Sequence, residues 1–303
     1  KDVLNRNAEI GSKFSNRGIE ILFLKEKPPD EVYGKFFIEA GALNYMPYQT
    51  AVNLRLTTDI EESPSTTTFR TLEGSFSIEP ANVNNDKIDA LGDEIENNDL
   101  NANFLGKTFS AGPIEYRFDY EKPVQFLLEY SYNVDADLNA KIKLCNAETE
   151  AKDADCDLEL VSNLGIAQSV IPITISKVKK TTYSSPDGNL IVKLSFEVVN
   201  LGTSGLDKTK NDNAEVELTI NPTSRIFSSM SCLSSSKTRS YKGANSIKFK
   251  LEDGKSTVEC IAKANFQEVY FNSLLDINLK YGYTTRLTKT VKIKPIAAFN
   301  LER

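Results

Sequence analysis

Residues 190–198 read Leu-Ile-Val-Lys-Leu-Ser-Phe-Glu-Val, and this stretch decides the fold. Lys193, Ser195 and Glu197 share one face of an extended chain, and apolar side chains occupy the other. Alternation with a period of two is typical of a β-strand that has one face in a core. We therefore predict an all-β fold in which the apolar face is buried, namely Leu190, Val192, Leu194, Phe196 and Val198.

The same alternation recurs on both sides of this stretch. It predicts about seven short strands in the second half of the chain, at the spacing expected for an immunoglobulin-like sandwich. Residues 252–255, Glu-Asp-Gly-Lys, are typical of a tight turn, so we expect 247–251 and 258–262 to pair as a hairpin. The strands expected in this half centre on 171–175, 190–198, 216–220, 247–251, 258–262, 275–283 and 287–293.

The first half has a similar but less regular pattern. Strands are expected near 18–24, 32–43, 51–57, 69–78, 114–120, 124–132 and 138–145. Within 80–110, Ile88, Leu91 and Ile95 have helical spacing, which predicts a short amphipathic helix; the alternative is a polar loop. The fold class predicted is two immunoglobulin-like β-sandwich domains in tandem, 18–145 and 170–296, with tails at 1–17 and 297–303 and a linker at 146–169.

The composition excludes much enzyme chemistry. Among 303 residues there is no histidine and no tryptophan. Without histidine, the chain lacks the usual base for a serine or cysteine nucleophile and the commonest metal ligand. No phosphate-binding or nucleophile-elbow motif is present. We therefore expect a protein that is not an enzyme, with no catalytic, cofactor-binding or metal-binding residues and no cofactor.

The charge and hydropathy limit the partners. The formal net charge is -6 and no basic stripe is present, so we expect no nucleic-acid partner. The longest apolar runs, such as 19–24, are too short to span a bilayer. No signal peptide is recognisable, so membrane attachment is expected only through an N-terminal anchor lost from the sequence.

The cysteines fall into two local pairs. Cys145 and Cys156 bracket an acidic segment, and Cys232 and Cys260 flank a Ser-rich segment and a later strand. An even number of locally paired cysteines is typical of two disulfides in an oxidising compartment. Two alternatives stay open at this point. The four thiols could be reduced and buried, or all four could bind zinc, although no CxxC spacing occurs.

A resemblance supports an extracellular assignment. The segment Phe196-Glu197-Val198-Val199-Asn200-Leu201-Gly202 resembles the strand-to-turn V-x-N-x-G segment of adhesion-type immunoglobulin-like domains on archaeal and bacterial surface proteins. Residues 173–178 look like the opening strand of these domains, and residues 18–21 in the first half resemble it more weakly. The first half has Ala40-Gly41-Ala42-Leu43-Asn44 in place of N-x-G. The resemblance covers most of 18–296 and implies non-catalytic work in adhesion or assembly.

Several polar and aromatic groups are weak candidates for sites. Asp135, Asp137 and Asn139 have the opening spacing of a calcium loop, but Ala140 and Asn146 stand where such a loop needs Gly and Glu. Asp153, Asp155 and Asp157 are expected to be hydrated rather than to bind calcium. The tyrosines at 116, 120, 130, 132, 281 and 283 are expected in a core or its rim rather than on a glycan platform, and 228–240 is expected to be an exposed loop rather than a glycosylated one.

These observations lead to one expected function and one alternative. We expect an extracellular or cell-surface structural subunit of a filament or envelope, a homo-oligomer that assembles through its tails and sheet edges. An exposed sheet edge can add a strand from another chain. The alternative is a surface binding module that recognises a glycan or a partner protein.

Overall fold

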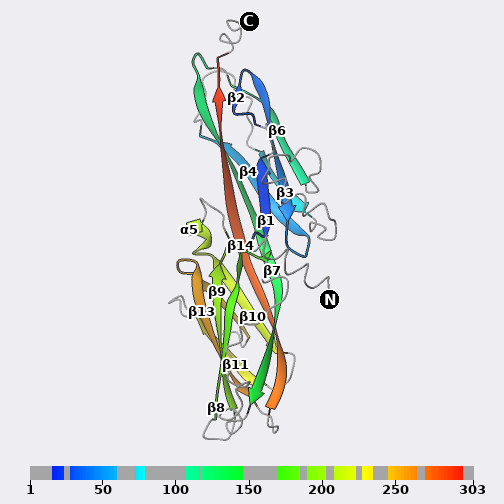
Figure 1. Ribbon diagram of the computed structural model, residues 1–303, viewed down its shortest axis with the longest axis vertical. Helices are drawn as coiled ribbons and strands as arrows, with labels where there is room; N and C mark the ends of the chain where they lie inside the picture. Colours follow the sequence, from blue (N-terminus) through cyan, green and yellow to red (C-terminus); the bar gives the residue numbers. More distant parts are fainter. Residues whose placement is uncertain are drawn as a thin grey trace, which may run out of the picture. The chain divides into compact units, whose positions relative to one another are not determined.

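The computed structural model describes residues 16–23, 28–59, 72–78, 107–116, 118–145, 170–184, 190–202, 208–222, 227–234, 245–264 and 270–295 (Figure 1). These residues form an all-β protein, with one helical turn, α5 (Lys208–Asn211). No helix among the described residues has the length and hydropathy needed to cross a membrane. The strands are β1 (Ile19–Phe23), β2 (Glu31–Val32), β3 (Lys35–Asn44), β4 (Thr50–Thr58), β5 (Leu72–Ile78), β6 (Lys107–Glu115), β7 (Lys122–Cys145), β8 (Ile173–Ser184), β9 (Leu190–Asn200), β10 (Glu215–Pro222), β11 (Phe227–Ser234), β12 (Ser246–Lys250), β13 (Lys255–Ala264) and β14 (Tyr270–Ile293).

The chain forms two compact units. Unit 1 comprises Lys1–Gly18 and Asn133–Tyr283, and unit 2 comprises Ile19–Tyr132 and Thr284–Arg303. This division differs from the expected domains 18–145 and 170–296, because β7 and β14 each contribute to both units. In β7 the alternation of apolar and polar residues continues past the boundary, and in β14 the alternation of buried and less buried residues continues as far as Thr285, so the strands do not end there.

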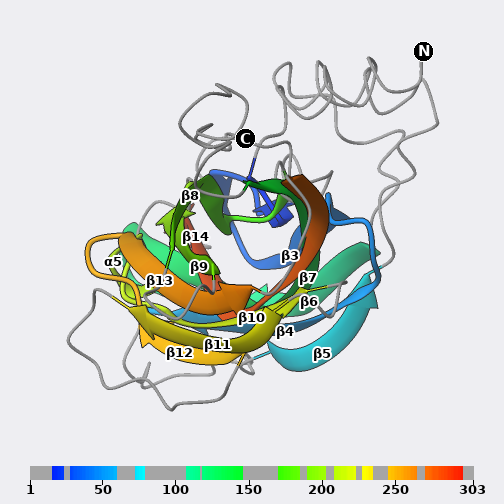
Figure 2. The same ribbon diagram turned by 90° about the horizontal axis from the view of Figure 1, so that it is seen from below.

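Unit 1 contains two sheets. One has the strand order β11-β13-β9-β8, and in the other the order is β12-β10-β14-β7. The sheets twist markedly, as Figure 2 shows for β11 and β13. The Tyr281 hydroxyl on β14 donates to the carbonyl of Ile173 on β8 at 2.8 Å, which ties the two sheets together. The core between them includes Ile175, Val192, Leu194, Phe196, Val198, Leu218, Phe249, Val258 and Ile277.

Unit 2 also has two sheets. Its first sheet has the order β1-β3-β6; in the second, β14-β7-β4-β5 are neighbours and β2 pairs in parallel with β14. Phe36 on β3 meets Phe126 on β7 edge-to-face, with ring centroids 5.7 Å apart. The Tyr130 hydroxyl donates to the Ile19 carbonyl, and the amides of Ile19 and Ile21 donate to the hydroxyls of Tyr132 and Tyr130. Tyrosines on β7 thus connect the second sheet to β1.

The predicted facing of the strands is confirmed where the alternation is strongest. The five apolar side chains of 190–198 are buried, as are Val52, Leu54 and Leu56 on β4. Five of the six tyrosines that were expected in a core or rim are buried. Tyr120 is the exception, with 66% of its surface exposed, because it lies beyond the end of β6 in the turn that leads into β7.

The hairpin predicted for 247–262 is wrong. β12 pairs with β10, whereas β13 pairs with β9 and β11, so the two segments belong to different sheets. The chain does reverse at Glu252–Lys255, where Asp253 and Gly254 have φ angles of 52° and 77°. The turn chemistry fixes the reversal, but it does not determine which sheet each strand joins.

Two more predictions differ from the structure. The strands expected at 124–132 and 138–145 are one strand, β7, with Asp135 and Asp137 on its exposed face. The end of the expected N-terminal tail packs on unit 1: Asn16 is buried, and its side-chain amide donates to the Ile171 carbonyl at 2.7 Å. A polar residue is stable there because its amide has a hydrogen-bond partner.

Other predictions fall outside the described residues. These include most of the N-terminal tail, all of the 146–169 linker with Asp153, Asp155 and Asp157, and the C-terminal tail at 297–303. The helix expected around Ile88, Leu91 and Ile95 lies outside them too, and the end of the 80–110 region, residues 107–110, begins β6.

The V-x-N-x-G segment forms the end of β9, and hydrogen bonds within unit 1 hold it in place. The Asn200 side-chain amide donates to Asp212 at 2.8 Å, and its carbonyl oxygen accepts from the amide of Gly202 at 3.1 Å. A Cβ on residue 202 would lie 2.0 Å from the Tyr283 hydroxyl oxygen. Glycine is therefore needed at 202 so that Tyr283 can approach the backbone.

Candidate functional site

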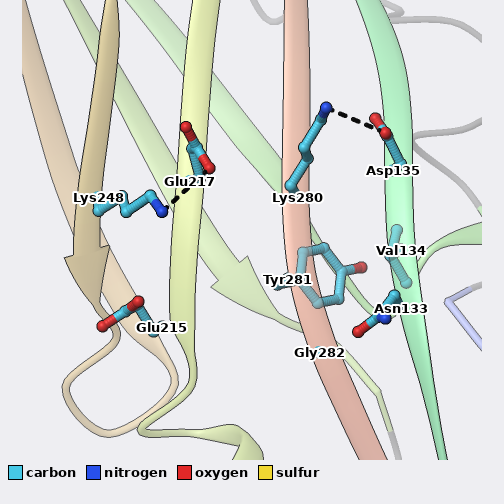
Figure 3. Close-up of a pocket in the computed structure, with 9 residues that line it drawn as sticks. All are labelled: Asn133, Val134, Asp135, Glu215, Glu217, Lys248, Lys280, Tyr281 and Gly282. Carbon is cyan, nitrogen blue, oxygen red and sulfur yellow. Dashed lines mark ion pairs between the residues drawn. The ribbon is translucent and has the colours of Figure 1, made fainter. Parts of the chain in front are cut away.

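A row of alternating charge crosses the exposed face of the β12-β10-β14-β7 sheet in unit 1. In the strand register, Glu217 lies opposite both Lys248 and Lys280. The Lys248 ammonium is 3.6 Å from Glu217, and the Lys280 ammonium is 3.1 Å from Asp135 (Figure 3). Oppositely charged residues on neighbouring strands stabilise a sheet modestly and fix its register. The row therefore has a structural role of its own.

Asp135 is the most constrained carboxylate of this row. It accepts a hydrogen bond from the Asn278 amide at 2.7 Å, and the same amide donates to Asp137 at 2.8 Å. Burial raises the pKa of Asp135, but the hydrogen bonds from Asn278 and Lys280 and the charge of Lys280 together hold its pKa below the usual value. Asp135 is therefore ionised at neutral pH and fully engaged.

Next to this row the sheet is hollowed at Gly282. Val216 pairs with Tyr281, so the antiparallel register places Glu215 of β10 opposite Gly282 of β14. Lys280 meets Asp135 and Asn278 meets Asp137, and the same two-residue step places Asn133 of β7 on the other side of Gly282. A groove of about 460 Å³ results, lined by Asn133, Val134, Asp135, Glu215, Glu217, Lys248, Lys280, Tyr281 and Gly282.

The missing side chain at Gly282 accounts for the groove. A Cβ on this residue would lie 3.6 Å from the Asn133 amide oxygen, an ordinary contact distance. A larger side chain could therefore stand here and fill the space without straining the backbone. Glycine in the interior of a strand often marks a close approach of another group.

The described residues provide no metal site. No group of three or more Asp, Glu or Cys side chains among them is arranged to hold a metal ion. Asp135 and Asp137, two members of the weak calcium-loop pattern, lie in mid-strand and bind Asn278 instead. A continuous strand cannot wrap its carboxylates around one ion as a loop does.

The cysteine sites are structural. Cys232 and Cys260 lie directly opposite each other on β11 and β13 and form a disulfide with a Cα–Cα distance of 4.0 Å. Cys145, buried at the end of β7, is also disulfide-bonded. Its expected partner, Cys156, lies outside the described residues. All three described cysteines are therefore oxidised, which disagrees with the reduced-thiol and zinc alternatives.

Sequence reasoning missed Glu215 and Gly282 and did not connect them to Asn133. One signal was present in the sequence: between Tyr281 and Tyr283, a glycine stands at the outward-facing position where the strand otherwise has a polar side chain such as Lys280. Glu215 and Asn133 are 67 and 149 residues away from it, and only the pairing of β10, β14 and β7 brings them together.

Comparisons with known proteins do not assign the chain to a family. No protein-family model matches it, and no curated protein does. Among solved structures, the envelope protein VP37 of White Spot Syndrome Virus aligns with 11% identity and a TM-score of 0.23, covering 50% of this chain and 98% of VP37. The calcium-binding domain CBD12 of CALX1.1 aligns with 9% identity and a TM-score of 0.19, covering 87% of this chain and 80% of that one. CBD12 of CALX1.2 aligns with 10% identity and a TM-score of 0.18, covering 80% and 75%. At these scores no fold or function is transferred to this chain.

Proposed function

We propose that this chain is an extracytoplasmic structural subunit that assembles by pairing the open edge of β11 with the same edge of a neighbouring copy. The observation that carries the proposal is the absence of charge on β11. The protein works as a building block rather than as an enzyme. The contribution of the tails, which lie almost entirely outside the described residues, stays a prediction.

The four outer strands of unit 1 differ in charge. Natural sheets protect exposed edges with charged side chains, especially lysine, because an open edge invites pairing with another chain. β8 carries three lysines, β12 carries two within five residues, and the unit 1 part of β7 carries two aspartates and two lysines. Lys180 of β8 also donates to the backbone carbonyl of Lys143 on β7. β11 (Phe227–Ser234) carries no charge at all.

The backbone of β11 is available for pairing. The 4.0 Å separation of Cys232 and Cys260 is typical of a pair that exchanges no backbone hydrogen bonds, so the N–H and C=O of Cys232 point away from β13. The same holds two residues earlier for Met230. Within the described residues β11 is the last strand of its sheet, so these groups face outward.

The side chains next to this edge also fit another copy. Leu233 is 57% exposed, and Ile261 on the neighbouring strand β13 is 42% exposed. When two copies of one strand pair antiparallel about a two-fold axis, a charged residue can face its own kind, and like charges directly opposite are destabilising. β11 avoids this problem, and Leu233 adds apolar area to the contact.

The test introduces charge on the edge strand β11. The double variant Ser231→Lys/Leu233→Lys places two lysines on β11 at exposed positions, and it is expected to remain folded but to shift the native assembly to monomer. Sedimentation velocity and negative-stain microscopy measure this shift. Leu201→Lys is the matched control, because Leu201 is 49% exposed in the same unit but outside β11. Assembly that is unchanged in the double variant, or equally reduced in the control, would overturn the proposal.

The oxidised cysteines support the extracytoplasmic location. Disulfides persist in oxidising compartments and are rare where glutathione and thioredoxin keep thiols reduced. Peptide mapping of protein isolated with an alkylating agent is expected to recover Cys232 linked to Cys260 and Cys145 linked to Cys156. Free, alkylated thiols at these positions in protein taken from its native source would exclude this location.

A further inference from the structure

The groove at Gly282 has hydrogen-bond acceptors on two sides that the protein itself does not use. In the part of the chain that the structure describes, Glu215 and Asn133 have no ion pair or hydrogen bond through their side chains. Glu215 stands on β10 and Asn133 on β7, on either side of the empty side-chain position of β14, and Figure 3 shows the Glu215 carboxylate on the β12 side of β10. The other charged groups of the groove are occupied, because Lys248 pairs with Glu217 and Lys280 pairs with Asp135.

The charge of the groove favours a cation. Its lining contains three carboxylates, Asp135, Glu215 and Glu217, and two ammonium groups, Lys248 and Lys280, which leaves one negative charge in excess. That excess resides on Glu215, the carboxylate without a partner. An anionic ligand would face Glu215, and the two ammonium groups that could attract it are already paired.

The spacing of the acceptors favours a guanidinium over an ammonium. β10 and β7 are separated by one intervening strand, so their backbones are about 9–10 Å apart, twice the usual strand spacing. A guanidinium is planar and directs its donors to opposite sides, whereas an ammonium is a compact and strongly hydrated point charge. With the Glu215 side chain turned toward Gly282, a guanidinium can reach an acceptor on each side of this residue at once.

We propose that this groove is a binding site for an arginine side chain of a partner protein. The Glu215 side chain turns toward Gly282 on binding, and the guanidinium lies over Gly282 and donates to the Glu215 carboxylate on one side and to the Asn133 amide oxygen on the other. The absence of a side chain at 282 leaves room for it. The site is independent of the β11 edge, which belongs to the other sheet of unit 1.

The probe is N-acetyl-arginine amide, titrated into the full chain labelled with ¹⁵N. The expected result is a saturable shift of the Gly282 amide and of the Asn133 side-chain amide, with a Kd on the order of millimolar for one charged contact. The neutral isostere N-acetyl-citrulline amide is expected to bind about tenfold more weakly, because a hydrogen bond to a charged donor is stronger than a neutral one. N-acetyl-lysine amide is the cationic control and is expected to bind more weakly than the arginine probe.

Variants of the chain test separately the charge of Glu215 and the space above Gly282. Glu215→Gln is expected to weaken binding of the arginine probe about tenfold. Gly282→Val, which fills the groove without changing its charge, is expected to abolish the shift. Glu252→Gln, which removes an exposed carboxylate of unit 1 away from the groove, is the matched control. Thermal unfolding checks that all three variants are folded.

Three results would overturn the proposal: no shift at Gly282 with the arginine probe, equal binding of the citrulline probe, or unchanged binding in Glu215→Gln. If the lysine probe binds as tightly as the arginine probe, the guanidinium geometry is wrong. This test is distinguishable from the test of β11 assembly, because Glu215→Gln is expected to leave the sedimentation of the protein unchanged.

Discussion

Both units use a tyrosine hydrogen bond to connect their two sheets, but they differ in a second kind of link between strands. In both, a buried tyrosine reaches across to the backbone of the opposite sheet: Tyr281 binds Ile173 in unit 1, and Tyr130 binds Ile19 in unit 2. Unit 1 adds a disulfide between its strands β11 and β13. Unit 2 adds ion pairs that hold its short strand β2 against β14, including Lys294 with Glu31 at 2.7 Å.

This difference has a physical consequence. A disulfide restrains the unfolded chain and is indifferent to pH, whereas an exposed ion pair contributes little and weakens with salt or acid. The β11–β13 pair of unit 1 is therefore expected to respond to reduction, and β2 of unit 2 to acid. The following experiments test this contrast, from the largest expected effect to the smallest.

The largest effect is expected in the core of unit 1. Phe196 is fully buried in mid-strand, so Phe196→Ala is expected to lower the free energy of unfolding by about 3–5 kcal/mol. Lys193→Ala on the opposite face removes an exposed pair with Glu259 and is expected to cost about 0.5 kcal/mol or less. Urea unfolding measures both. Equal losses would show that the facing of β9 does not govern the stability of this unit.

The second effect concerns the disulfide. Replacing both Cys232 and Cys260 by alanine opens a link between residues 28 positions apart and is expected to destabilise unit 1 by about 2–4 kcal/mol. Unit 2 has a core of its own, which includes Phe36 and Phe126, and its amides are expected to keep their protection from hydrogen exchange. Equal loss of protection in β3 and β4 would contradict the contrast, because the two units would then unfold together.

The third effect concerns the close approach at Gly202. Gly202→Ala forces a Cβ against the Tyr283 hydroxyl and is expected to cost about 1–3 kcal/mol of unfolding free energy. Tyr283→Phe removes that hydroxyl oxygen. The cost of Gly202→Ala is therefore expected to be smaller in the Tyr283→Phe background, which a double-mutant cycle measures. Additive costs would mean that the clashes with Pro172 Cβ and the Tyr283 ring carbon Cζ, each 2.9 Å from the added atom, dominate instead.

The local sequence predicted the strand faces well, because burial on one side of a strand leaves a period-two pattern. The pattern at 190–198 identified five buried residues of β9. It failed at the domain boundary because β7 and β14 are 24 residues long, far beyond the usual strand length of about five or six. The polar residues Asp135 and Asp137 looked like the start of a loop, although they occupy the exposed face of a continuous strand.

The local sequence pattern could not predict which distant segments pair with each other. The hairpin predicted for 247–262 had the right turn but the wrong partners, since each of its strands joins a different sheet. The groove at Gly282 depends on the same kind of information. Its glycine was visible, but the positions of Glu215 and Asn133 beside it follow from the sheet order β10-β14-β7 alone.

The smallest effect is the response of unit 2 to acid. The ion pair of Asp30 with Lys289 and those of Glu31 with Lys294 and Lys292 surround β2. The hydrogen bond and charge of Lys289 lower the pKa of Asp30, and those of Lys294 lower the pKa of Glu31. A carboxylate whose pKa is lower in the folded state stabilises that state above its unfolded pKa, and this stabilisation is lost as the pH falls through the folded pKa.

The stabilisation of β2 is therefore expected to be complete above the ordinary carboxyl pKa values of 3.8 and 4.5 and to disappear below them. The amides of Lys292 and Lys294 donate to Asp30 and Val32, so their hydrogen exchange, corrected for intrinsic rates, reports the release of β2. Protection of these amides is expected to fall in this acid window, while that of the β11–β13 pair in unit 1 stays level. In Asp30→Asn/Glu31→Gln the acid step is expected to vanish because no carboxyl group remains to titrate. A step that persists in this variant would place its origin elsewhere in unit 2, and an equal step in β11 and β13 would remove the contrast between a unit held by a disulfide and a unit held by charge.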